Sequence, residues 1–118
     1  MTKVIWLKEP EEHNYPAAES YLSLLYPAAQ VEKIIANLRA AKSVTFKAKD
    51  VFRASGLSLL GVSNSHVEKD REKVKSGKAL SPLLLVRDAG RVIIADGYHR
   101  MCAVYVEDED AEIPCRIV

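Results

Sequence analysis

Apolar positions recur at helical spacing most clearly in one stretch of the chain. Val31, Ile34, Ile35 and Leu38 lie at positions i, i+3, i+4 and i+7, and charged residues occupy the other faces, so we expect an amphipathic helix here. Pro27 precedes this stretch, and proline ends one helix while being tolerated at the start of the next. This is the strongest helix prediction of the sequence.

The chain before Pro27 predicts a strand and a further helix. The apolar run 3–7 is expected to form a short strand. Asn14 can cap a helix that has Pro16 in its first turn, a position where proline is tolerated. The apolar face of this helix is expected to consist of Tyr21, Leu22 and Leu25.

Shorter elements are predicted in the middle of the chain. Residues 44–46 are typical of a strand, and residues 49–55 of a brief helix that ends at Gly56. An apolar connector follows over 57–62, and residues 65–75 predict a charged helix.

The last third of the chain predicts a hairpin followed by a strand-helix-strand unit. Two apolar runs, 83–86 and 92–94, flank a short loop containing Gly90. The segment from Asp96 to Glu112 is long enough for a crossover helix that returns to a parallel neighbouring strand at 113–118. We therefore expect a single α/β (α+β) domain over residues 1–118, built as a mixed sheet with packed helices.

Composition narrows the class of protein. The 118 residues are 48% hydrophobic and 28% charged, typical of one globular domain. A net charge of +1 provides no global field for nucleic acid. No apolar run could span a bilayer, and the start of the chain resembles neither a signal nor a transit peptide, so we expect a cytoplasmic protein without membrane contact.

The two cysteines do not indicate a metal site. Cys102 and Cys115 lie among apolar neighbours, with no CxxC pair and no clustered histidine. We expect both to be buried packing thiols.

The candidate chemistry lies in residues 96–100, where the sequence Asp-Gly-Tyr-His-Arg is expected to open a helix. Helix N-termini carry unpaired N–H groups and partial positive charge. His99 and Arg100 in the same turn oppose that field unless an anion binds, and phosphate is the usual one. On the preceding charged helix, His66, Lys69 and Lys73 share one face and can approach the same anion.

These residues resemble the ParB/sulfiredoxin superfamily. The similarity covers about residues 65–118, and residues 1–60, an N-terminal helical part, match no family. It rests on the sequence pieces SPLLLV (81–86), GRVIIADGYHR (90–100), Ala103 and Ile113-Pro114.

The resemblance implies a nucleotide, ATP/ADP or CTP, bound through its phosphates at the strand-to-helix turn, with Mg²⁺ as a further expected cofactor. The phosphate-binding residues would be Gly97, Tyr98, His99, Arg100, His66 and Lys69. Sulfiredoxins carry a catalytic cysteine where this chain has Tyr98, so their thiol chemistry is not expected. The Asp-Gly-x-x-Arg turn is most similar to that of free-serine kinases, which implies phosphoryl transfer to a small-molecule acceptor.

Several alternatives stay open on sequence grounds. Asp96 can cap the helix, hold Mg²⁺ or act as a base, and Glu12 can serve as a general base if its loop folds over the site. The rival function is a non-catalytic DNA- or protein-binding module. Residues 49–63 resemble a helix-turn-helix, which favours this function. Phe52 argues against it, because that motif usually has a small residue where its two helices touch. A vestigial site in an assembly subunit is a third reading, and homo-oligomers are compatible with all three.

Overall fold

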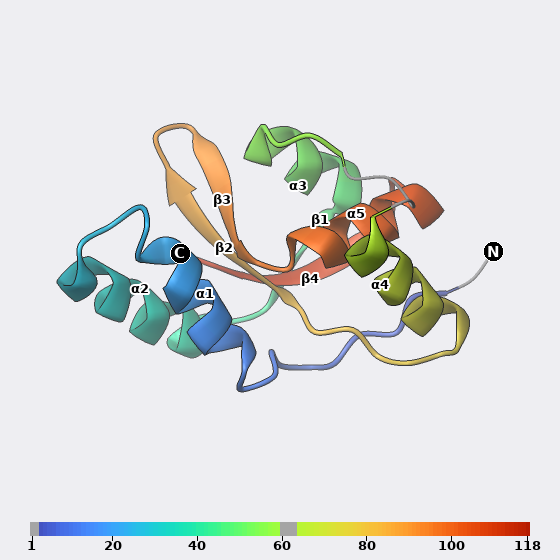
Figure 1. The fold of residues 1–118 in the computed structure, drawn as a ribbon, viewed down its shortest axis with the longest axis horizontal. Helices are drawn as coiled ribbons and strands as arrows, with labels where there is room; N and C mark the ends of the chain where they lie inside the picture. Colours follow the sequence, from blue (N-terminus) through green and yellow to red (C-terminus); the bar gives the residue numbers. More distant parts are fainter. Residues whose placement is uncertain (1–2, 60–63) are drawn as a thin grey trace.

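A four-stranded mixed sheet separates two helical layers (Figure 1). The computed structural model describes residues 3–59 and 64–118. Within them the strands are β1 (Val44–Lys47), β2 (Leu83–Asp88), β3 (Arg91–Asp96) and β4 (Glu112–Ile117), in the spatial order β1-β4-β2-β3. β2 runs parallel to β4, and the other two pairings are antiparallel. The expected α+β class with a mixed sheet is confirmed.

The apolar run at the start of β2 packs against both layers. Successive strand side chains point to opposite faces of a sheet. Leu84 and Val86 belong to a core with α1 (Asn14–Leu22) and α2 (Ala28–Ala40). Leu83 and Leu85 belong to a second core with α3 (Ala48–Ser55) and α5 (Tyr98–Glu107). A strand buried on both faces needs no polar alternation, which explains its uniform composition.

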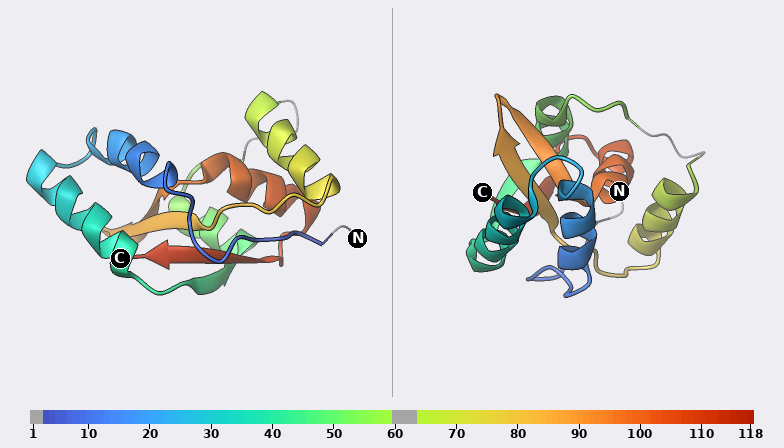
Figure 2. Two further views of the ribbon diagram at one scale, coloured as in Figure 1. Left: turned by 90° about the horizontal axis from the view of Figure 1, so that it is seen from below. Right: turned by 60° about the vertical axis from the view of Figure 1, so that its left-hand side comes forward.

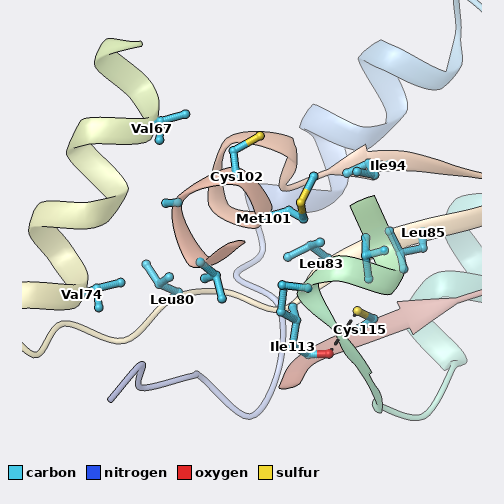
Figure 3. Packing of buried hydrophobic residues seen from close by; sticks show 14 residues of the cluster. Val67, Val74, Leu80, Leu83, Leu85, Ile94, Met101, Cys102, Ile113 and Cys115 are labelled. Atoms are coloured by element: carbon cyan, nitrogen blue, oxygen red, sulfur yellow. Dashed lines mark hydrogen bonds between the residues drawn. The ribbon is translucent and has the colours of Figure 1, made fainter. Parts of the chain in front are cut away.

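The remaining helix, α4 (Ser65–Lys75), packs alongside α5 (Figure 2). Its apolar contacts come from Val67 and Val74, which are 0% and 1% exposed. Figure 3 shows both side chains pointing to the side where Cys102 and Leu80 lie. This contact fixes which face of α4 is turned toward the start of α5.

Several predicted elements are confirmed. In α2, Val31, Ile35 and Leu38 are buried and Ile34 is half-buried. The charged helix has the predicted bounds, and α3 ends at Gly56 with a φ of 67°. The β2–β3 hairpin turns through residues 89–90 with φ values of 50° and 79°.

Two predictions near the N-terminus are wrong. Residues 3–7 form no strand, because their pairing is limited to a bridge between Trp6 and Leu80 with its flanking backbone hydrogen bonds. Asn14 is not the cap of α1 but its first residue, and its Oδ1 accepts a hydrogen bond of 2.7 Å from the N–H of Glu11. The side chain therefore stabilises the turn before the helix.

The face that α1 buries also differs from the prediction. Tyr15, Ala18 and Leu22 are buried, at i, i+3 and i+7, whereas Tyr21 and Leu25 are 42% and 47% exposed. The helix ends at Leu22, before Pro27, so the turn at 23–26 rather than the proline terminates it. Pro27 does precede α2, as predicted.

The crossover to a parallel neighbour is likewise wrong. The strand that follows α5, β4, is inserted between β1 and β2 and runs parallel to β2, not to β3. Since β2 and β3 form an antiparallel hairpin, β4 runs opposite to the strand it follows. In this inner position Ile113 and Cys115 are fully buried.

Cys102 and Cys115 are both buried, as expected. Burial raises the pKa of the Cys115 thiol to about 12, which keeps it protonated and unreactive. Among the described helices, none combines the length and the apolarity that crossing a bilayer requires.

Candidate functional site

The turn from β3 into α5 depends on Gly97. Its φ of 109° lies in the left-handed region, and a Cβ there would come within 2.8 Å of Leu83 Cγ and 2.9 Å of Arg100 Nη2. Both a positive φ and a close approach therefore require glycine. This residue turns the chain so that the first N–H groups of α5 lie beside α4.

A cavity of about 220 Å³ lies between α4 and the start of α5. The structure brings together here all but one of the side chains predicted for the site. They are His66, Lys69, Asp96, Gly97, Tyr98, His99 and Arg100. Lys73, expected on the same helix face as His66 and Lys69, also lines the cavity, and Asp70 joins them. A small anion is bound by basic side chains that converge on a hollow, as they do here. DNA binding uses basic side chains that are spread along an exposed convex face.

Arg100 is already engaged within the protein. Its Nη2 lies 3.0 Å from Asp96 Oδ2 and donates to the carbonyl oxygen of Pro82 (3.3 Å), and its Nε donates to the carbonyl oxygen of Ser81 (3.0 Å). The side chain is 16% exposed. Arg100 thus connects the turn to the start of β2 in addition to contributing charge to the cavity.

Asp96 does not cap α5. Its carboxylate accepts from Arg100 instead, and no side chain caps this helix. The contrast with α4 is direct, because there Asn64 Oδ1 accepts from the N–H groups of His66 and Val67. Of these two helix N-termini, only that of α5 has no side-chain cap for its first N–H groups.

The imidazole rings of His66 and His99 lie against each other, with centroids 4.8 Å apart and planes inclined by 43°. Burial, and next the neighbouring His66, hold the pKa of His99 below its usual value, against the opposing field of Asp70. The neutral form of His99 is therefore favoured near neutral pH.

Asp70 is a site residue that the sequence analysis did not single out. It is 9% exposed and lies between Val67 and Val74 on the face of α4 that is buried. Burial raises its pKa, although Lys73, 3.8 Å away, and the cavity's other cations oppose this. Its position at i+4 from His66 was the available signal, because that spacing places both on one helix face.

Tyr98 forms a wall of the cavity. Its hydroxyl donates a hydrogen bond to the carbonyl oxygen of Ser58, and burial raises its pKa. A neutral phenol held by a backbone carbonyl positions the loop after α3, which agrees with a wall rather than a nucleophile.

Glu12 is not brought to this cavity. Its side chain is 79% exposed and forms an ion pair of 2.7 Å with Arg39 of α2. The neighbouring Glu11 accepts a hydrogen bond of 2.6 Å from Ser81. The loop therefore packs against α2 and the start of β2, so the general base predicted from Glu12 is not placed to act.

A second hollow, of about 370 Å³, is lined by the same turn. It shares residues 96–99 with the first cavity, and its remaining walls are apolar or aromatic: Tyr21, Leu57, Ile94 and Ala95. Tyr21 and Leu57 are 42% and 41% exposed. The turn thus lines both a charged hollow and a more apolar one.

The helix-turn-helix candidate is only partly covered by the structure. Its first helix corresponds to α3, and residues 57–59 have no regular secondary structure. The remainder of that prediction falls on residues 60–63, which lie outside the described residues.

In the described part of the chain, no group of three or more His, Cys, Asp or Glu residues is arranged to hold a metal ion.

No protein-family model matches the sequence, and neither curated proteins nor solved structures give a match. The fold and site define an α+β protein with a mixed His, Lys and Asp cavity at a helix N-terminus.

Proposed function

We propose that this protein binds a nucleotide, ATP, ADP or CTP, through phosphates held in the cavity between α4 and α5. The observation that carries the proposal is the convergence of His66, Lys69 and His99 on the uncapped start of α5. Phosphate oxygens accept hydrogen bonds from free N–H groups and are attracted by the positive end of a helix. The superfamily resemblance of residues 65–118 supports the same ligand.

Charge around the cavity favours an anion that arrives from solvent. Asp70 and Asp96 are each paired with a cation, Lys73 and Arg100 respectively. Lys69 is exposed and has no ion pair among the described residues. Lys69 is therefore the cation with most freedom to pair with a phosphate, and such charge-assisted contacts are the stronger ones.

The neighbouring hollow favours a nucleotide over inorganic phosphate. A ligand whose phosphates lie against His99 can direct its base across the turn toward Tyr21 and Leu57. Pockets for such ligands combine apolar walls with a few polar groups. Here the turn at 96–99 contacts both parts.

Magnesium fits this cavity as a companion of the nucleotide rather than as a resident ion. Asp96 Oδ2 already accepts a hydrogen bond from Arg100, and the described residues contain no preformed set of metal ligands. Mg²⁺ is commonly bound largely through substrate phosphates and water. Phosphoryl transfer to a small-molecule acceptor remains part of the proposal through the resemblance to free-serine kinases.

Thermal unfolding with ATP, ADP and CTP, with and without Mg²⁺, tests the proposal. A ligand at about 100 times its Kd stabilises the folded state by about 2.7 kcal/mol, which for a chain of this size raises Tm by several degrees. Lys69→Gln should reduce the shift. Lys75→Gln is the matched control, because Lys75 is exposed on the same helix and does not line the cavity.

The absence of any shift at about 5 mM nucleotide, well above common affinities, would contradict nucleotide binding. Equal shifts in wild type, Lys69→Gln and Lys75→Gln would place the ligand elsewhere.

A further inference from the structure

Two histidines from different helices meet in the cavity. His66 is the second residue of α4, and His99 is the second residue of α5. Their ring centroids lie 4.8 Å apart. Each imidazole therefore lies in the first turn of its helix, and the partial positive charge of the N–H groups there disfavours a protonated His99 ring. Two protonated rings at this separation would also repel each other.

The remaining groups around the pair include three cations and two carboxylates. From α4 it faces Lys69, Asp70 and Lys73, and from α5 and the turn it faces Tyr98, Arg100 and Asp96. Asp96 is neutralised by Arg100 at 3.0 Å. Asp70 has a longer ion pair, 3.8 Å, with Lys73. Its negative charge favours the protonated form of His99. Without a ligand, Asp70 is the main group in the cavity that favours a protonated ring.

A phosphate group reverses this balance. Its negative charge beside the rings favours imidazolium, and each protonated ring offers an N–H donor to a phosphate oxygen. We propose, on the basis of the proposed function, that the His66–His99 pair takes up a proton when a phosphate-bearing ligand enters, and that Asp70 is the positioning residue that stabilises the protonated pair. Occupancy of the site is then controlled by pH in the range where histidine titrates.

The direction of the pH effect follows from linkage. A ligand that raises the pKa of the pair binds more tightly to the protonated protein, so its affinity falls as the pH rises through the pKa of the free and then of the bound state. With one proton taken up, the affinity falls by up to about tenfold per pH unit.

Ring NMR of the histidines measures this directly, because the chain has only three. His13 is the internal control, since its side chain is 74% exposed and it does not line the cavity. Sulfate is the probe, because it remains a dianion throughout and contributes no proton of its own. We expect sulfate to move the midpoints of His66 and His99 upward while that of His13 stays in place.

Asp70→Asn should lower the sulfate-bound midpoints of His66 and His99, and Lys75→Gln should leave them unchanged. A merely structural role of Asp70 would alter stability without moving these midpoints.

Calorimetry with ADP at about pH 6 and about pH 8 separates the two proposals. Binding that weakens toward the higher pH supports the inference, if the proton uptake detected from its dependence on buffer ionisation exceeds that of the terminal phosphate of ADP, which itself titrates at about pH 6. Tight binding without proton uptake, and with unmoved histidine midpoints, overturns this inference and leaves nucleotide binding standing. No binding of ADP or sulfate at either pH overturns both.

Discussion

Arg100 and Asp96 form an ion pair of 3.0 Å across the first turn of α5. The same guanidinium donates to the carbonyl oxygen of Ser81 at 3.0 Å, just before β2. The residue whose sequence position suggested phosphate binding is therefore also a link between the turn and the sheet. Substitutions at Arg100 report on folding as well as on ligand binding, and Lys69 is the cleaner test of the latter.

Replacing Arg100 should destabilise the fold. Arg100→Ala leaves the Ser81 and Pro82 carbonyls and the Asp96 carboxylate without a donor in a largely buried place, so we expect a loss of about 2–4 kcal/mol. Arg100→Lys keeps the charge but not the planar fork of donors, and should fall between. Urea denaturation measures both. Wild-type stability in Arg100→Ala would show that these contacts contribute little.

Alanine substitutions at Gly97 and Gly56 can be compared directly, because both glycines have a positive φ. Gly97→Ala combines a left-handed φ with a Cβ 2.8 Å from Leu83 Cγ, and should cost about 2 kcal/mol or more. Gly56→Ala has the same kind of backbone but open space around the new methyl group, so about 1 kcal/mol is expected. Equal losses in denaturation midpoints would mean that Leu83 moves aside freely.

His99 should make the ligand-free protein less stable in mild acid. Its folded pKa is lower than in the unfolded chain, where it titrates near 6.5. Between these two values the unfolded state binds more protons, so stability falls as the pH drops through 6.5 toward the folded pKa. His99→Gln should flatten this slope, and His13→Gln should not. The free energy of unfolding of both variants, measured at several pH values above about 5.5, where most carboxylates do not titrate, tests this difference. Equal slopes in both variants would contradict the prediction.

Asp70→Asn should stabilise the ligand-free protein at neutral pH. Burial raises the folded pKa of Asp70, so its charged form weakens the fold once the pH exceeds that value. The gain from asparagine should shrink as the pH is lowered toward the range in which Asp70 itself becomes protonated. A loss of stability at neutral pH would mean that the ion pair with Lys73 outweighs the cost of burial.

Local signals predicted the elements that depend on few distant contacts. The spacing of Val31, Ile35 and Leu38 determines α2, and Gly90 determines the hairpin turn. Predictions failed where a distant partner decides the outcome. The insertion of β4 between β1 and β2 depends on long-range pairing, and residues 3–7 lack a second strand with which to pair over more than one bridge.

The candidate site was likewise predicted where local spacing decides and missed where distant contacts decide. Helical spacing placed His66 and Lys69 on one face, and the structure turns that face toward His99. Asp70 was missed because charged residues on a polar helix are usually solvated, and only the packing of Val67 and Val74 against α5 buries it. Glu12 was misplaced because its partner, Arg39, lies on a helix that no local pattern connects to the loop.

The most direct test of a phosphate site is an amide ¹H–¹⁵N titration of the full chain with ADP and Mg²⁺. Nucleotide binding in the cavity predicts saturable shifts concentrated at the N–H groups of residues 97–101 and at Lys69 and Asp70, with smaller shifts at Tyr21 and Leu57. Unshifted amides at these positions at about 5 mM ADP, or shifts confined to another surface, would contradict the account.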